Sequence, residues 1–142
     1  MKDFNKVYLN ILDSLKELSD DKKRKVSSII VKDGNIISYG VNVIPNESSR
    51  NEDRCGKDLK KYWLEHSERN AIFKAAKKGI ALEGSEMYVN YFPCADCARA
   101  IMQCGIKKVY SPKPNLEESK WKESWKESIF ILTEADVEIE FI

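Results

Sequence analysis

Four residues in the middle of the chain are of the types, and at the spacing, that metal-assisted hydrolysis needs. His66, Cys94 and Cys97 offer one imidazole and two thiolates, a set that can hold one Zn²⁺ ion and leave its fourth tetrahedral position open for water. Glu68 follows the histidine by two residues and can lie beside the metal as a general acid/base. The chain has a single histidine, so no other imidazole competes for this role. These residues predict a catalytic zinc centre.

The two remaining cysteines leave a structural zinc site as an alternative, because such a site takes four protein ligands. Cys104 lies seven residues beyond Cys97, about 10 Å further along a helix that rises about 1.5 Å per residue, so we expect it in the core. Cys55 lies in a loop, and geometry leaves it open as a fourth ligand. In that case the protein would be a zinc-stabilised binding module without a catalytic role for Glu68.

Length and charge limit the class of protein. A chain of 142 residues is expected to form a single domain, residues 1–142, around one core. The formal net charge of +1 argues against a nucleic-acid partner and favours a small-molecule substrate. There is no membrane-length apolar run, and the four cysteines do not resemble a secreted disulfide framework. We therefore expect a cytoplasmic protein that does not bind membranes.

The hydrophobic pattern of the first half predicts one helix and a β-hairpin. Apolar residues from Phe4 to Leu18 recur at helical spacing after a possible N-cap, Asp3. The charged run 20–25 is interpreted as a solvated connection. Strands are expected at 26–32 and 35–43, joined by the tight turn Asp33-Gly34. Residues 45–62 show no period and predict a long functional loop.

The second half alternates between helices and strands. A helix is expected from His66 to the stop at Gly79, a strand at 87–92, and a helix after Pro93 that carries Cys94 and Cys97 on one face of its first turn. A strand at 107–110, a helix with Trp121, Trp125, Ile129 and Leu132 on one stripe, and a strand at 137–141 complete the chain. This order predicts an α/β domain with a mixed sheet of about five strands.

Candidate substrate-binding residues are less sharply defined. Asn42 lies at the end of the second strand, shortly before Pro45, where it serves either as a turn residue or in function. The loop 45–62 carries basic residues that are either solvated or in contact with a phosphate: Arg50, Arg54, Lys57, Lys60 and Lys61.

Three motifs identify a family resemblance. They are the segments 40–46 (GVNVIPN), 66–72 (HSERNAI) and 92–98 (FPCADCA). The H-x-E and P-C-x-x-C pattern is the signature of zinc deaminases that act on nucleobases. From about Ile29 onward the chain resembles the deoxycytidylate deaminase branch of the cytidine deaminase-like superfamily.

The resemblance implies a three-layer α/β/α fold with a mixed sheet, and a zinc ion held by His66, Cys94 and Cys97. It also implies that Glu68 shuttles protons and that Asn42 and Ser67 contact the nucleotide. Relatives assemble into dimers and hexamers, so a homo-oligomer is expected.

The chain departs from its relatives at several positions near the expected substrate. Val43 stands where relatives commonly carry Gly, and Ser67 where they carry Ala. Relatives tend to have a Tyr after the fourth strand, near the base; here Trp121 is the candidate for stacking on the base, although it also belongs to a buried stripe. These departures leave open the nucleotide and any regulation by a deoxynucleoside triphosphate.

The predicted reaction is hydrolytic deamination at C4 of a cytosine nucleotide, dCMP to dUMP, by a zinc-activated water with Glu68 as proton shuttle. Alternatives are a deaminase of guanine, cytidine or a modified cytosine nucleotide, or the non-catalytic zinc-stabilised module. Deamination of adenosine in tRNA is disfavoured by the near-zero net charge.

Overall fold

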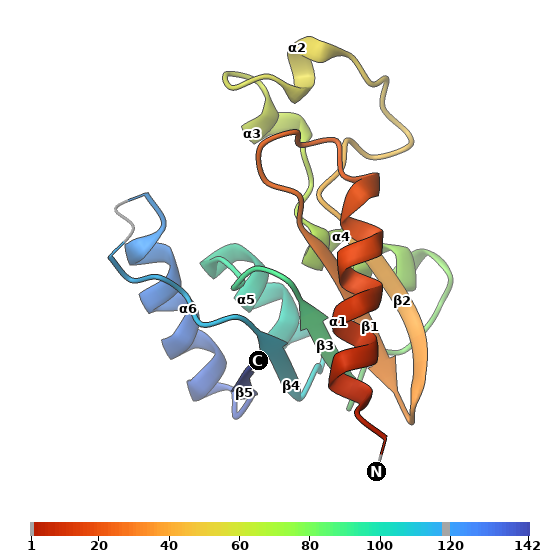
Figure 1. The fold of residues 1–142 in the computed structure, drawn as a ribbon, viewed down its shortest axis with the longest axis vertical. Coiled ribbons are helices and arrows are strands. Elements are labelled where there is room, and N and C mark those ends of the chain that lie inside the picture. Colours follow the sequence, from red (N-terminus) through yellow and green to blue (C-terminus); the bar gives the residue numbers. More distant parts are fainter. Residues whose placement is uncertain (1, 118–119) are drawn as a thin grey trace.

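The computed structural model describes residues 2–117 and 120–142, in which five strands form one sheet (Figure 1). The strands are β1 (Ser27–Lys32), β2 (Asn35–Val41), β3 (Glu86–Val89), β4 (Lys108–Ser111) and β5 (Glu138–Phe141), in the spatial order β2-β1-β3-β4-β5. β1 pairs antiparallel with β2 and β3, whereas β3, β4 and β5 run parallel. The predicted mixed five-stranded sheet is confirmed.

Helices cover both faces of this sheet. α1 (Phe4–Leu15) packs on one face against β1 and β3, and α4 (Ser67–Lys77), α5 (Ala95–Gln103) and α6 (Lys122–Glu134) lie on the other (Figure 1). The connections hold three short helices: η1 (Lys16–Leu18), α2 (Glu52–Cys55) and α3 (Lys60–Trp63). The predicted three-layer α/β/α architecture is confirmed. No helix among the described residues has the length and apolarity needed to cross a bilayer.

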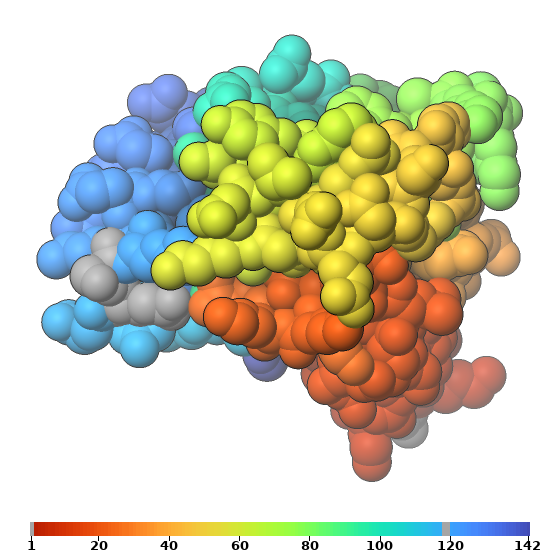
Figure 2. All heavy atoms as spheres, turned by 90° about the horizontal axis from the view of Figure 1, so that it is seen from above, coloured from red at the N-terminus to blue at the C-terminus, as the bar shows by residue number. Residues whose placement is uncertain are grey.

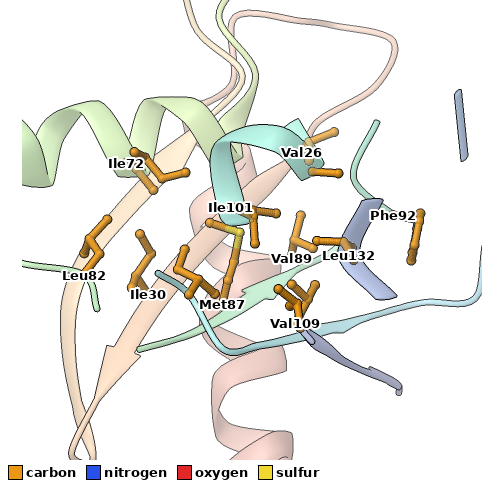
Figure 3. Close-up of a cluster of buried hydrophobic side chains, with 14 of the residues drawn as sticks. Val26, Ile30, Ile72, Leu82, Met87, Val89, Phe92, Ile101, Val109 and Leu132 are labelled. Carbon is orange, nitrogen blue, oxygen red and sulfur yellow. The ribbon is translucent and has the colours of Figure 1, made fainter. Parts of the chain in front are cut away.

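The strand register divides the core between the two faces. Residues paired across neighbouring strands point to the same side of a sheet. Ile30, Met87 and Val109 are aligned in this way and pack with the three-helix layer (Figure 3). The neighbouring row, Ile29, Tyr88 and Tyr110, faces α1, where it meets Tyr8 and Leu12. β1 is therefore buried on both faces, which explains its continuous apolar run.

The predicted hairpin is confirmed, and its turn has the backbone conformation that the sequence implies. Asp33 and Gly34 both have positive φ, 51° and 78°, as a two-residue turn between twisted strands requires. The second strand ends at Val41, earlier than expected, and Val43 forms only an isolated bridge with Glu65. This bridge draws the chain just before α4 towards the end of β2.

The third strand is also shorter than predicted, since it ends at Val89 instead of continuing to residue 92. The Asn90 side chain explains this. Its Oδ1 accepts a hydrogen bond from the Ser27 amide (2.8 Å) and its Nδ2 donates to the Lys25 carbonyl (3.1 Å). The Asn90 N–H still donates to the Ser27 carbonyl (3.2 Å), but the side-chain Oδ1 takes the Ser27 amide in place of the Asn90 carbonyl, so the strand pairing ends here and the chain turns towards Pro93.

Two expectations about the connections are wrong in part. The run 20–25 is not simply solvated, because Asp21 is buried (7% exposed) and accepts hydrogen bonds from the Lys23 amide (2.9 Å) and from Lys60 Nζ (3.1 Å). The loop 45–62 contains α2 and the start of α3. These segments are therefore joined to each other by a partly buried ion pair.

The first helix buries less of its apolar stripe than its spacing suggests. Tyr8 and Leu12 are buried, but Phe4, Val7 and Leu18 are more than half exposed. The last predicted turn is the 3₁₀ helix η1, which ends at Leu18.

Gly40 is needed because α4 passes directly over β2. A Cβ built at Gly40 would lie 2.5 Å from the Ala71 amide nitrogen and even closer to the Ser67 carbonyl oxygen. Asn70 Oδ1 accepts a hydrogen bond from the Val41 amide (3.2 Å) at the same crossing. The start of α4, which carries His66 and Glu68, is thus positioned by backbone-to-backbone contact.

We expect Gly40→Ala to destabilise the protein by about 1–3 kcal/mol, since the added methyl group must push α4 away from the sheet. Thermal unfolding followed by circular dichroism measures this. Gly34→Asn is the control, because nothing lies within 4 Å of a Cβ there and Asn tolerates positive φ. Equal unfolding midpoints for the two variants would contradict the close-contact explanation.

Candidate active site

Three predicted metal ligands come together where two helices begin. His66 is the N-cap residue of α4, Cys94 is the N-cap residue of α5, and Cys97 lies in the first turn of α5. His66 Nδ1 is 3.5 Å from Cys94 Sγ and 3.4 Å from Cys97 Sγ. All three donor atoms lie within 4.8 Å of one another. The predicted convergence of these side chains is confirmed.

The donor set and its spacing fit zinc. With Zn–S and Zn–N bonds of about 2.3 and 2.0 Å, a tetrahedral zinc places sulfur and nitrogen ligands about 3.5 Å apart, close to the observed separations of 3.5 and 3.4 Å. Cys55 and Cys104 do not belong to this group of potential ligands among the described residues. Cys104 is half-buried and its thiol lies 3.4 Å from the Ile101 carbonyl. The site therefore has three protein ligands, as in catalytic zinc centres.

The two ligand thiols share one proton, so that only Cys94 is favoured as a thiolate before metal binds. A hydrogen bond from the Cys97 thiol, together with the neighbouring His66, outweighs burial and lowers the pKa of Cys94 to about 4. The hydrogen bond to Cys94, together with burial, raises the pKa of Cys97. The hydrogen bond with Cys94 raises the pKa of His66. Helix N-termini also stabilise anionic sulfur. The site is thus suited electrostatically to a divalent cation.

Glu68 is held in the interior beside these ligands. It is 4% exposed, and burial raises the pKa of its carboxyl group, which is the behaviour expected of a group that exchanges protons near neutral pH. Ser67 Oγ donates to Glu68 Oε1 (2.7 Å) and also lies 2.6 Å from Ser28 Oγ on β1. Ser67 is completely buried, so water does not compete for this hydrogen bond, and the Ser67 hydroxyl orients the Glu68 carboxyl group.

His66, Ser67, Glu68 and Cys94 line a cavity of about 610 Å³. Its walls come from the segments around 21–26, 57–69, 91–96 and 120–125, and three of these segments adjoin on the face in Figure 2 (orange-red, yellow-green and blue). Cationic side chains outnumber acidic ones in the lining by seven to three. The cavity thus combines a metal site with an anion-attracting wall. We call six of these cations the cationic rim: Lys23, Arg24, Lys57, Lys60, Lys61 and Lys120.

Asn42 lines the cavity, but most of its side-chain hydrogen-bonding capacity is used within the fold. Its Oδ1 accepts from the Val26 amide (2.9 Å) and from Ser19 Oγ, and its Nδ2 donates to the Arg24 carbonyl (2.7 Å). The residue is 5% exposed. Asn42 therefore holds the segment that carries Arg24 into the cavity wall.

Trp121 lies beside the metal ligands. Its ring meets that of His66 edge-on, with ring centroids 6.4 Å apart at 71°, and it lines the cavity. Its indole Nε1 is buried and has no hydrogen-bond partner in the part of the chain that the structure describes. The predicted base-stacking residue is thus within reach of a bound ligand.

Arg50 and Arg54, in contrast, do not line the cavity. Arg50 pairs with Asp20 (3.1 Å), and Arg54 lies over the Trp63 ring (3.7 Å). Lys23 and Arg24 belong to the run predicted to be a solvated connection, but both line the cavity. Their backbone amides donate to Asp21 Oδ1 (2.9 and 3.3 Å), and Asp21 pairs with Lys60, a contact between distant segments that no local sequence signal reveals.

A three-ligand zinc site beside a buried carboxyl group, inside a cavity of this size, defines a zinc-dependent hydrolase. Residues 2–112 match the family described as the cytidine and deoxycytidylate deaminase zinc-binding region. The chain belongs to this family of zinc-dependent deaminases.

Individual relatives agree with this assignment. The chain is 34% identical over 125 residues to an uncharacterized deaminase in the luxG 3′ region of Aliivibrio fischeri, covering 87% of this chain and 83% of that protein. It is 57% identical over 44 residues to deoxycytidylate deaminase of phage T4, which is 31% of this chain and 23% of the phage protein. The human deoxycytidylate deaminase matches at 37% over 98 residues, 64% of this chain and 54% of the human protein. Most of these alignments thus span only part of the relatives.

Solved structures extend the similarity to the whole chain. The dCMP deaminase of cyanophage S-TIM5 in apo form superposes with a TM-score of 0.80 at 31% identity, covering 100% of both chains. The same cyanophage enzyme in complex with dCMP and dUMP gives a TM-score of 0.79 at 30% identity, covering 100% of this chain and 99% of that one.

We expect Cys97→Ser to lose bound zinc, because a hydroxyl is a far weaker zinc ligand than a thiolate. Cys55→Ser should retain one zinc per chain, since Cys55 is not grouped with the ligands. Metal content after gel filtration, measured by plasma mass spectrometry, distinguishes the two. Loss of zinc from Cys55→Ser would instead indicate a closed, structural site.

Proposed function

We propose that this chain catalyses the hydrolytic deamination of dCMP to dUMP, with release of ammonia. The observation that carries this proposal is a cavity in which His66, Cys94 and Glu68 face a wall rich in cations, with Cys97 grouped with His66 and Cys94 just behind its surface. A cytosine ring at the metal would leave its sugar phosphate to the cationic rim. The similarity to a cyanophage dCMP deaminase along the whole chain supports the same substrate.

Bound zinc supplies Lewis-acid activation of a water molecule. Glu68 would take a proton from the water as the water oxygen bonds to C4, and would deliver this proton to N3 of the cytosine ring. It would then move the proton of the new C4 hydroxyl to the amino group, which leaves as ammonia while C4 becomes a carbonyl. A buried carboxyl group with a raised pKa suits both transfers, because it is able to hold the proton between them. Ser67 keeps Glu68 oriented through its hydrogen bond to Oε1.

The remaining contacts are assigned by position. We assign Asn42 and Ser67, which line the cavity, to the sugar of the nucleotide, and Trp121, whose ring meets that of His66 edge-on, to stacking on or donating to the base. Lys57 and Lys61 contact the 5′-phosphate, in place of Arg50 and Arg54, since the two lysines line the cavity and the two arginines do not.

We also propose a cellular compartment and an oligomeric state for this enzyme. Two thiolate ligands and two further free cysteines suit a reducing compartment, so we place the protein in the cytoplasm. Exposed apolar side chains on the outer surfaces of α1 and α4, such as Phe4 and Phe73, support a homo-oligomer, either a dimer or a hexamer.

Zinc-loaded protein should deaminate dCMP, seen as the ultraviolet change from cytosine to uracil, and should process deoxycytidine much less efficiently, since the nucleoside lacks the phosphate. CMP, dCTP and guanine complete the panel. Activity on guanine alone would contradict the substrate assignment, and inactivity on all five with zinc bound would contradict the enzyme assignment.

Glu68→Gln, measured on dCMP in this assay, should fold and bind zinc but lose turnover by about 10²–10⁴-fold, the usual contribution of a positioned acid/base group. The amide keeps the shape and the contact with Ser67, so the loss reports on proton transfer. Turnover within a few-fold of the unmodified enzyme would contradict the proton-shuttle role.

The double variant Lys57→Ala/Lys61→Ala should raise KM for dCMP by roughly tenfold or more, since charged hydrogen bonds contribute about 1.5–3 kcal/mol each. Its kcat/KM for deoxycytidine should change little. Lys22→Ala is the matched control, because Lys22 is exposed and does not line the cavity. Parallel losses on dCMP and deoxycytidine would contradict phosphate recognition by these lysines.

A further inference from the structure

Arg69 is a cation in a position that helix electrostatics disfavours. It is the third residue of α4, where the N-terminal end of the helix is itself electropositive. It also faces the cavity that contains the metal ligands. Its side chain is only 23% exposed, so water screens little of the repulsion between the guanidinium and the helix N-terminus. Its partners explain why it is held there.

The Arg69 guanidinium lies between two carboxylates that belong to the two ligand-bearing segments. Its Nε donates to Glu65 Oε1 at 2.6 Å, and its Nη1 lies 3.8 Å from Asp96 Oδ2. Glu65 directly precedes His66, and its Oε1 also accepts the His66 amide (3.1 Å). Asp96 lies between Cys94 and Cys97 in the chain.

We propose that Arg69 is a positioning residue for the metal centre, which ties the N-terminus of α4 to that of α5 and thereby sets the distance between His66 and the two thiolates. Arginine suits this role because its planar group can engage two carboxylates at once. The role concerns the metal ligands themselves, so it does not depend on dCMP being the substrate.

The competing explanation is that Arg69 takes part in an ordinary surface charge cluster. Arg99 provides the comparison, because its Nη2 bonds the same carboxylate, Asp96 Oδ1, at 2.5 Å. Arg99 is 51% exposed, pairs within its own helix at i,i+3, and is not part of the cavity lining. Removing either arginine thus takes one cation from Asp96. Only the removal of Arg69 also breaks the link between the N-termini of α4 and α5.

The test uses the full chain loaded with Co²⁺ or Zn²⁺, without substrate. We expect Arg69→Gln to release zinc to the chelator 4-(2-pyridylazo)resorcinol roughly 10–100-fold faster than the unmodified protein, the range typical for groups that orient metal ligands. The visible absorption of the Co²⁺-loaded variant should change, because the tetrahedral ligand geometry is altered. Arg99→Gln should match the unmodified protein in both measurements.

Arg69→Lys keeps the charge but has one ammonium group that cannot span both carboxylates, so we expect metal release faster than in the unmodified protein and slower than in Arg69→Gln. The Arg69→Lys variant also allows the proposal to be tested if Arg69→Gln fails to fold. Unchanged release and spectrum in a folded Arg69 variant would overturn the proposal. Equal acceleration in Arg99→Gln would overturn it as well, since the effect would then come from the charge on Asp96. Inactivity of the unmodified protein on dCMP would affect only the proposed function.

Discussion

The structure depends on bringing the N-termini of two helices to one metal ion. His66 is separated by about thirty residues from the cysteines, yet its Nδ1 lies within 3.5 Å of both sulfurs. This is possible because α4 and α5 lie side by side on one face of the sheet, each beginning at the same end of the cavity. Two electropositive helix ends would repel each other, and the thiolates between them offset that repulsion.

The sheet supplies the rigid support for this arrangement. α4 approaches β2 so closely at Gly40 that no side chain fits between them. Below α5, aligned strand residues such as Met87 and Val109 fill the space between sheet and helices. Because a packed core deforms little, these contacts fix where α4 and α5 lie on the sheet.

The cavity wall, in contrast, is held in place by hydrogen bonds and ion pairs of polar side chains and not by apolar packing. Asp21 and Asn42 are both buried and both bind backbone groups of the segment 23–26. Asp21 also binds Lys60, so one ion pair joins the two sides of the cavity mouth. The buried Asp21 carboxylate is stable only while its hydrogen-bonding and charged partners remain. Because one of these partners, Lys60, belongs to α3, the position of the cationic rim depends on the position of α3.

The sequence by itself determined the chemistry of the centre and the order of the elements. The types and spacing of His66, Cys94 and Cys97 identify a zinc site, and hydrophobic periodicity together with Asp33-Gly34 predicts the hairpin and the mixed sheet, because these signals are local. Only the tertiary structure decided which polar residues face the ligand. Arg50 and Lys57 are both basic residues of one aperiodic loop, yet one binds Asp20 and the other lines the cavity. Their directions, and the link that Arg69 forms between two helices, follow from contacts between residues far apart in the chain, which no local pattern encodes.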